Sequence, residues 1–195
     1  MKNNKLPGID RASVEGYRQE FPIVKTGIYL DHAGVAPIPV RVIREVDRFL
    51  AEAAEKAIIS YEGWMERVEG VRAQSARLVG AEKDEIAFIK NTSHGISIVT
   101  GGLDWKEGDN VLVFEKEFPS NIYPWLDLKR KGVEVRFIPL RDDRIRLDDI
   151  ENLMDRRTRL VSMSSVQSLN GFMIDLRKLG VLCRRKGVLF FVDAI

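Results

Sequence analysis

The sequence predicts an α/β fold in which a mostly parallel sheet is flanked by helices. From about residue 80 onward, short apolar runs alternate with segments that have helical periodicity, which is typical of this class. Hydrophobic residues make up 45% of the 195 residues and charged residues 31%, the composition of an ordinary globular domain with a sizeable core. Glycines and prolines separate the periodic segments and mark where elements end.

Charge and hydropathy exclude several classes of protein. The sequence has 31 Lys+Arg and 29 Asp+Glu, which leave a formal charge of +2. A net charge this close to zero does not indicate a nucleic-acid-binding protein. The longest strongly apolar run, residues 188–192, is far shorter than the ~20 residues of a membrane helix, and no apolar stretch follows the first residues as in a signal peptide. The single cysteine, Cys183, forms no internal disulfide. We therefore expect a cytoplasmic protein with no membrane or nucleic-acid partner.

Three helices and one strand are predicted before residue 80. Residues 10–22 form a short helix that ends at a Phe-Pro pair, and residues 28–30 form a short strand that opens into a loop of small residues. Pro37 and Pro39 suit the first turn of the next helix. The apolar faces of the two long helices are Ile43, Val46, Leu50, Ala53 and Ala57 for the first, and Trp64, Val68, Val71 and Leu78 for the second. Gly80 is the expected stop.

After residue 80 the pattern predicts five strands separated by helices. The strands are expected at residues 85–90, 110–114, 133–140, 159–166 and 188–192. The helices are expected at residues 91–102, 119–131 and 147–154, and after the cap Asp175. Gly132 and Gly187 lie just past the expected end of a helix.

In open α/β sheets, ligands bind beyond the carboxyl ends of the strands, so the residues after each strand are the candidate site. Thr92 and Ser93 stand where a helix begins, and free N–H groups at a helix N-terminus favour a phosphate. The alternative is that one of the two hydroxyls is only an N-cap. Both interpretations stay open on the local pattern.

Phe118 and Asp193 follow two other strands. The Phe118 ring could lie flat on a planar ligand, or it could pack as a hydrophobic staple for the following helix. Asp193 ends an apolar strand, where a carboxylate is costly to bury without a partner. A protonated ring nitrogen would supply that partner through a charge-assisted hydrogen bond. The alternative is an aspartate that opens an exposed loop.

Polar side chains also follow the strand at 159–166, where Gln167 could hydrogen-bond a ligand. The alternative is turn chemistry, because Asn170-Gly171 is a strong turn pair. His32 and His94, the two histidines, have no ligand spacing with Cys183, so no metal site is expected. Cys183 lies on an apolar helix face and is interpreted as a core residue rather than a nucleophile.

Five motifs in order resemble the class V aminotransferase family, which includes cysteine desulfurases, selenocysteine lyases and kynureninase. Residues 29–34 (Tyr-Leu-Asp-His-Ala-Gly) resemble the opening segment of the family, and residues 91–95 (Asn-Thr-Ser-His-Gly) its phosphate-binding turn. Residues 117–121 (Glu-Phe-Pro-Ser-Asn), followed by Pro-Trp at 124–125, resemble its Glu-His-His-Ala-Asn…Pro-Trp stretch. Residues 165–171 resemble its Val-Ser-Asn-x-x-Gly turn, and residues 192–194 its Val-Asp-Ala strand end.

The resemblance implies the large domain of a fold-type-I enzyme that uses pyridoxal 5′-phosphate (PLP). It implies that Thr92 and Ser93 hold the phosphate and that Asp193 pairs with the pyridine nitrogen, which makes the ring an electron sink. Phe118 stands where many relatives have a stacking histidine; it can stack but cannot relay protons. Gln167 is the expected contact to the ring oxygen of the cofactor.

His32 and Ala33 are the expected substrate-side residues. A homodimer and an amino-acid substrate are implied in the same way.

The resemblance also implies a Schiff-base lysine beyond Asp193, and no lysine of this chain has that context. The sequence stops within an apolar run, so we expect an N-terminal portion, with a segment at 1–27 and a partial PLP-binding domain at 28–195, and we assign no catalytic residue. Two other classes remain as alternatives. One is a non-catalytic α/β binding module that ends at residue 195. The other is a dinucleotide-binding domain, which the lack of Gly-x-Gly-x-x-Gly after any strand disfavours.

Overall fold

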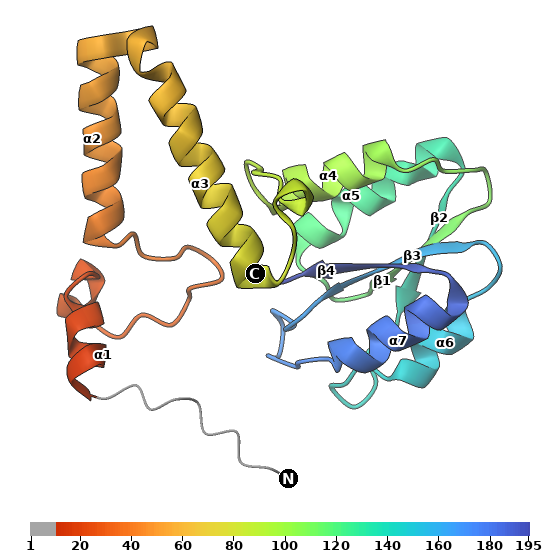
Figure 1. Cartoon of the computed structure of the whole chain (residues 1–195). Coiled ribbons are helices and arrows are strands. Elements are labelled where there is room, and N and C mark those ends of the chain that lie inside the picture. The colour runs from red at the N-terminus through yellow and green to blue at the C-terminus, as the bar shows by residue number, and fades with distance from the viewer. Residues whose placement is uncertain (1–10) are drawn as a thin grey trace. The chain divides into compact units, whose positions relative to one another are not determined.

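The structure is a computed structural model that describes residues 11–195, and it forms two compact units. The first unit ends at Ala87 and the second runs Phe88–Ile195. Residues 1–10, which belong to the expected N-terminal segment 1–27, lie outside the described residues. Figure 1 shows the helical first unit in red to yellow and the sheet-containing second unit in green to blue.

The first unit is helical, and its helices confirm the periodicity seen in the sequence. Its elements are α1 (Arg11–Arg18), η1 (Pro22–Lys25), α2 (Val40–Lys56), η2 (Ala57–Ser60), α3 (Tyr61–Val79) and η3 (Lys83–Glu85). Pro39 is the N-cap residue of α2. Gly80 ends α3 in the left-handed region, with a φ of 70°, which glycine adopts without a steric penalty.

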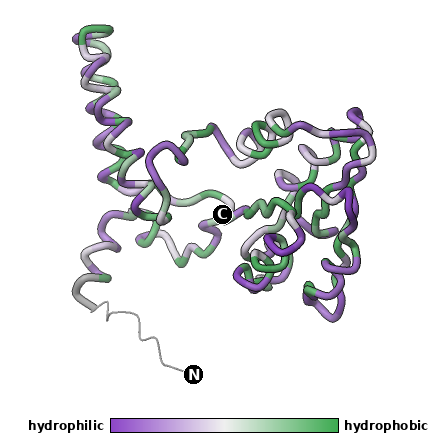
Figure 2. The backbone as a smooth tube through the Cα atoms, turned by 45° about the vertical axis from the view of Figure 1, so that its right-hand side comes forward, coloured by the Kyte–Doolittle hydropathy of each residue, from purple (hydrophilic) through white to green (hydrophobic). Residues whose placement is uncertain are grey.

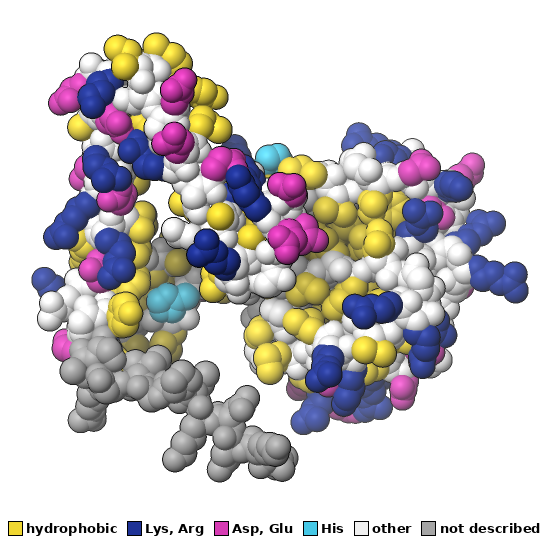
Figure 3. Space-filling model, viewed as in Figure 1, with side chains coloured by type: hydrophobic (Ala, Val, Ile, Leu, Met, Phe, Trp, Pro, Cys, Tyr) yellow, Lys and Arg dark blue, Asp and Glu magenta, His cyan; other side chains and the backbone are white. Residues whose placement is uncertain are grey.

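The two long helices of this unit contact each other through an aromatic pair and a shared carboxylate. The rings of Phe49 and Trp64 lie 5.1 Å apart. Glu52 on α2 accepts hydrogen bonds from Trp64 Nε1 at 3.1 Å and from Arg67 Nη2 at 2.6 Å. Other apolar side chains of the same helices, among them Val46 and Leu50, remain about half exposed. Figure 3 shows such side chains in yellow along the helical pair.

Two predicted strands are absent from the described residues. Residues 28–30 form no regular element, and residues 86–90 are not part of a strand either, although Ile86 has an extended φ of −102° and ψ of 121°. A strand needs a hydrogen-bonding neighbour, and no ladder in the described part of the chain includes either segment. Both predictions, made from apolar runs alone, were wrong for this reason.

The second unit contains a four-stranded parallel sheet, which confirms the predicted fold class. The strands are β1 (Asn110–Phe114), β2 (Glu134–Ile138), β3 (Thr158–Ser164) and β4 (Leu189–Asp193), in the order β2-β1-β3-β4. All three neighbouring pairs are parallel. Parallel strands need crossover connections, and the helices between the strands supply them.

Helices cover both faces of this sheet. They are α4 (Thr92–Gly102), α5 (Tyr123–Leu126), α6 (Leu147–Leu153) and α7 (Leu176–Lys186). Figure 1 shows α4 and α5 on one side of the strands and α6 and α7 on the other. The predicted helix at 119–131 is divided into η4 (Pro119–Asn121), α5 and η5 (Asp127–Lys131), and Gly132 follows with a φ of 73°.

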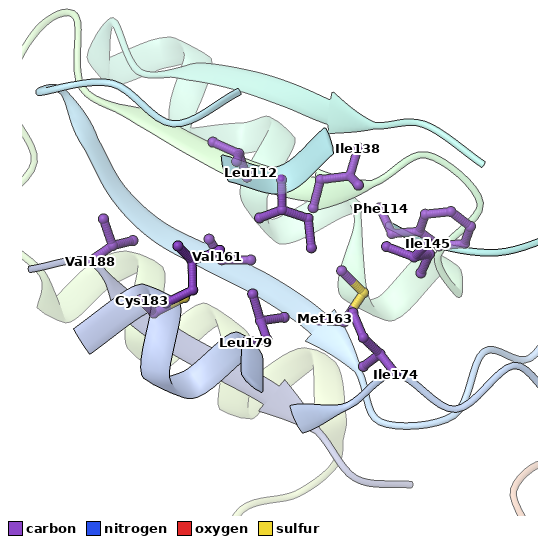
Figure 4. Close-up of a cluster of buried hydrophobic side chains, with 12 residues drawn as sticks. Leu112, Phe114, Ile138, Ile145, Val161, Met163, Ile174, Leu179, Cys183 and Val188 are labelled. Carbon is purple, nitrogen blue, oxygen red and sulfur yellow. The ribbon is translucent and has the colours of Figure 1, made fainter. Parts of the chain in front are cut away.

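The sheet separates two buried apolar clusters. Val111 and Val113 of β1 pack with Ile96 and Trp125 on the α4/α5 side, whereas the alternating residues Leu112 and Phe114 face the α6/α7 side. Figure 4 shows Leu179 and Cys183 of α7 directed at Val161 and Met163 of β3. Figure 2 shows hydrophobic and hydrophilic stretches alternating along the chain. Burial on both faces of the sheet explains why the sequence of β1 is a nearly continuous apolar run.

Candidate functional site

The carboxyl ends of β1, β3 and β4 lie at one edge of the sheet, and the candidate residues follow them. Ser164 of β3 is the register partner of Asp193 of β4, the last residue of each strand. The Ser165 N–H donates to the carbonyl oxygen of Asp193 at 2.8 Å, which joins the two strand ends. This edge is where ligands bind in open α/β sheets.

Helix α4 begins with two hydroxyl side chains that take no part in its cap. The cap is Asn91, whose Oδ1 accepts from the His94 N–H at 2.9 Å. Among the described residues, the hydroxyls of Thr92 and Ser93 form no hydrogen bond, and the Thr92 side chain is half-buried. An 11-residue helix therefore presents free N–H groups and two free hydroxyls at its positive end.

Phe118 is the N-cap residue of η4 and remains 56% exposed. Its ring takes part in no aromatic contact within residues 11–195. The side chain belongs to neither buried apolar cluster of the second unit, and more than half of its surface is open to solvent.

Asp193 is 9% exposed, so its carboxylate is largely removed from water. Its Oδ1 accepts from the Ile195 N–H at 3.1 Å, and no cation pairs with it in the described part of the chain. The structure therefore contains a buried carboxylate without a counter-ion, a costly arrangement unless a ligand supplies the positive partner.

Gln167 is 2% exposed and its two amide ends differ. Its Nε2 donates to Glu117 Oε1 at 3.1 Å and to the Ser164 carbonyl oxygen at 3.2 Å. Its Oε1 is buried and has no hydrogen-bond partner among the described residues. A buried acceptor without a donor costs roughly 1–3 kcal/mol, so a ligand donor would be favoured there. The Asn170-Gly171 turn also forms, with Gly171 at a φ of 70°.

Glu117 is a buried residue of this edge that the sequence interpretation did not single out. It is only 6% exposed and its carboxylate accepts four hydrogen bonds, two of them from Ser164. Its position directly before Phe118, three residues after the end of β1, was the available signal. Its partners lie 47 and 50 residues further along the chain, so no local pattern indicates them.

His32 and Ala33 lie in the first unit, within a turn closed by a hydrogen bond from the Gly34 N–H to Asp31 Oδ1 at 3.1 Å. Both side chains are exposed, and the His32 ring contacts Tyr29 edge-on at 5.5 Å. His32 also lines an apolar cavity of about 440 Å³ with residues that include Tyr17, Phe21 and Leu30.

Cys183 is 1% exposed in the core of the second unit, which confirms its prediction as a core residue. Burial raises the pKa of its thiol to about 11. Within residues 11–195, no group of three His, Cys, Asp or Glu residues is arranged to hold a metal ion. None of the helices described is long and apolar enough to span a membrane.

Comparison with known proteins gives a consistent result. A family model described as aminotransferase class-V matches residues 28–195. A probable cysteine desulfurase of Methanothermobacter thermautotrophicus is 33% identical over 186 residues, which cover 92% of this chain and 46% of that protein.

Two solved structures share the fold. The cysteine desulfurase CsdA from Escherichia coli has a TM-score of 0.79 at 24% identity, over 92% of this chain and 48% of that one. A C-DES mutant with glycine linked covalently to its PLP cofactor has a TM-score of 0.81 at 23% identity, over 90% and 48%.

The chain spans about half the length of the curated relatives it matches. The sheet and its flanking helices are consistent with part of the large domain of a fold-type-I enzyme, and the cofactor of such enzymes is PLP. Because the family model covers residues 28–195, the chain belongs to the class-V aminotransferase family.

Proposed function

We propose that this chain is the N-terminal part of a PLP-dependent enzyme that acts on an amino-acid substrate, with cysteine desulfurase-like chemistry. The proposal rests on polar groups in the second unit whose charge or hydrogen-bonding capacity residues 11–195 do not satisfy. Among the described residues of this unit are a helix N-terminus with two free hydroxyls, a buried carboxylate without a cation and a buried amide oxygen without a donor. The helix N-terminus is complementary to the phosphate of PLP, and the carboxylate is complementary to its protonated pyridine nitrogen.

The phosphate would be held at the N-terminus of α4. The hydroxyls of Thr92 and Ser93 would donate hydrogen bonds to the phosphate. The free N–H groups of the first turn would donate as well, at the positive end of the helix dipole. The cap formed by Asn91 keeps the helix terminus fixed without using either hydroxyl. Residues 92 and 93 therefore bind the anion, and Asn91 orients them.

The ring would be held by Asp193, Phe118 and Gln167. Asp193 accepts a hydrogen bond from the protonated pyridine nitrogen and keeps the proton there. The exposed Phe118 ring stacks on the cofactor. When bound, PLP supplies an electron sink for the negative charge that develops on the substrate. Phe118 carries no ionisable group, so it excludes water and orients the ring but moves no proton.

The same proposal has four further parts. Residues 28–195 form part of the large domain, His32 and Ala33 lie on the substrate side, the enzyme is a homodimer, and it is located in the cytoplasm. They rest on the family membership and, for the location, on the single cysteine. No residue of this chain is assigned a covalent role, because none of its lysines has the context of the Schiff-base lysine.

Titration of the full chain with PLP tests the proposal. We expect saturable binding that is reversed by dialysis and weakened by inorganic phosphate, which competes for α4. The double variant Thr92→Ala/Ser93→Ala is the matched comparison and should bind PLP at least tenfold more weakly. A folded chain that shows no saturable binding would instead favour the non-catalytic binding module.

A further inference from the structure

Phe118 presents an exposed ring on a backbone that is fixed from both sides. The residue is 56% exposed and belongs to neither buried apolar cluster of the second unit. Its N–H donates to Glu117 Oε2 at 3.2 Å, and its carbonyl oxygen accepts from the Asn121 N–H at 2.8 Å. Pro119 follows and restricts Phe118 to extended backbone, with φ −62° and ψ 143°. The backbone is therefore held in place, although the ring adds little to the core.

The Glu117 carboxylate joins this backbone to the end of β3. Its Oε1 accepts from the Ser164 N–H at 2.6 Å and from Gln167 Nε2 at 3.1 Å. Its Oε2 accepts from Ser164 Oγ at 2.6 Å as well as from the Phe118 N–H. Ser164 is the register partner of Asp193, the candidate partner of the cofactor ring nitrogen. One side chain thus connects the loop that carries the exposed ring to the strand end next to Asp193.

Burial makes this connection stiff. Glu117 is 6% exposed, so little water competes for its four hydrogen bonds, and bonds to a charged acceptor are the stronger kind. A ring on a mobile loop would lose conformational freedom when it stacks on a ligand, and that loss weakens binding. A ring whose backbone is already fixed avoids most of this loss. The apolar core does not use the Phe118 ring, so a ligand that stacks on it is what gains from the fixed backbone.

We propose that Glu117 is a positioning residue, which accepts the Phe118 N–H and so holds the Phe118 ring where it stacks on the cofactor. The inference rests on the proposed PLP site and names the residue that keeps one wall of that site in place. Glu117 acts through the backbone of Phe118 and is assigned no contact with the cofactor. Its substitution should therefore weaken the binding of the cofactor ring and leave the binding of the phosphate unchanged.

Glu117→Gln separates the contact with Phe118 from the other three. Glutamine keeps one side-chain oxygen, which can still accept from the Ser164 N–H and from Gln167 Nε2. Its NH2 group then takes the place of Oε2. Ser164 Oγ can turn and accept from that group, because a hydroxyl both donates and accepts. The Phe118 N–H can only donate, so it loses its acceptor. The substitution thus releases the backbone of Phe118 and keeps the connection to β3.

The test compares PLP with inorganic phosphate, which competes with PLP at α4 and has no ring. In Phe118→Ala, which removes the stacking ring, the dissociation constant of PLP should rise about tenfold. In Glu117→Gln it should rise about fivefold, because the ring is present but no longer held. The dissociation constant of phosphate should change less than about twofold in either variant. Glu117→Gln added to Phe118→Ala should weaken PLP binding by less than about twofold more, because the ring through which Glu117 acts is gone.

Glu115→Gln is the matched control, because Glu115 lies two residues earlier, is exposed and accepts from the Leu140 N–H at 3.0 Å. Neither dissociation constant should change in this variant. A Glu117→Gln chain in which both constants rise by the same factor has lost only structural support, and the proposal is then wrong. An equal effect of Glu117→Gln with and without the Phe118 ring also contradicts it.

Hydrogen exchange gives a second test that needs no folded variant. The Phe118 N–H should exchange about a hundredfold more slowly in the unaltered chain than in an unstructured peptide, although the residue is exposed. Exchange at the rate of the peptide would show that Glu117 does not hold this N–H, which overturns the proposal. If the unaltered chain and Phe118→Ala bind PLP equally well, this inference fails and the PLP site stands. If the unaltered chain binds phosphate but shows no saturable binding of PLP, the proposed function fails and the inference fails with it.

Discussion

The Oδ1 atom of Asn91 accepts the His94 N–H at 2.9 Å and so caps α4 in place of the hydroxyls that follow it. Asn91 has the extended backbone of an N-cap, with φ −166° and ψ 174°. The capping side chain and the proposed anion-binding hydroxyls are therefore different residues within 91–93. Substitutions at neighbouring positions should separate stability from ligand affinity.

Asn91→Ala should lower the free energy of unfolding by about 1 kcal/mol, the usual cost of removing an N-cap. Thr92→Ala leaves the cap in place and should change the free energy of unfolding by less than about 0.5 kcal/mol. Urea unfolding of both variants beside the unaltered chain measures the difference. If Thr92→Ala destabilises the chain as much as Asn91→Ala, the Thr92 hydroxyl supports the helix and is not free for a phosphate.

Asp193→Asn should weaken PLP binding and leave the fold intact or more stable. The substitution removes a buried charge that pairs with none of the described cationic side chains, while the remaining amide oxygen can still accept from the Ile195 N–H. Loss of a charge-assisted hydrogen bond to the pyridine nitrogen, worth roughly 1.5–3 kcal/mol, should raise the dissociation constant of PLP about 10- to 100-fold.

Fluorescence titration with PLP measures the dissociation constant of Asp193→Asn, and urea unfolding measures its free energy of unfolding. Asp104→Asn, a change at an exposed aspartate of the same unit, is the control and should alter neither. Destabilisation of Asp193→Asn by more than about 1 kcal/mol would show that the carboxylate has a structural partner, contrary to its role as a ligand group.

Sequence patterns predicted the helices well because the information for a helix is local. The positions of Trp64, Val68 and Val71 define one helix face, and Gly80 ends the helix with a φ of 70°. The strand β1 was predicted with its observed bounds, since a buried parallel strand reads as an uninterrupted apolar run between turn residues. The strands expected at 28–30 and 85–90 failed because a strand is defined by its neighbour, which a local pattern does not contain.

The residues of the candidate site also differ in whether a local sequence pattern could indicate them. The sequence placed Thr92 at a helix start and Asp193 at a strand end, and the structure has both at those positions. The cap was missed because three consecutive residues, Asn91 to Ser93, are all good capping types. Glu117 was missed because what makes it important is its contact with Ser164 and Gln167, which are close to it only in the folded chain.

Asp155 should make the stability of the second unit depend on pH below about 4. Arg136 Nη1 donates to its Oδ2 at 2.7 Å, and this contact lowers the pKa of the carboxyl to about 2; hydrogen bonds from the Arg157 N–H and from Asn110 act in the same direction. The folded form therefore holds the proton less tightly than the unfolded chain. The stabilising contribution is present above pH 4 and is lost as the pH falls from about 4 to about 2.

Asp155→Asn should accordingly be less stable than the unaltered chain at pH 7, and the difference should shrink as the pH approaches 2. The side chain is 43% exposed, so solvent screening limits the effect at pH 7 to about 1 kcal/mol. Urea unfolding at several pH values measures the difference between the two chains, so that the titration of other carboxylates cancels. A difference that stays constant from pH 7 to pH 2 would contradict the lowered pKa.

Cys183 should be almost unreactive in the folded chain, although it is the single thiol of the sequence. With its pKa raised to about 11 by burial, roughly one molecule in a thousand carries the reactive thiolate at pH 8, and only 1% of the residue is exposed. We expect reaction with an aromatic disulfide reagent to be at least a hundredfold slower in buffer than in concentrated urea. Rapid reaction of the folded chain would show that α7 opens readily, and would return Cys183 to consideration as a nucleophile.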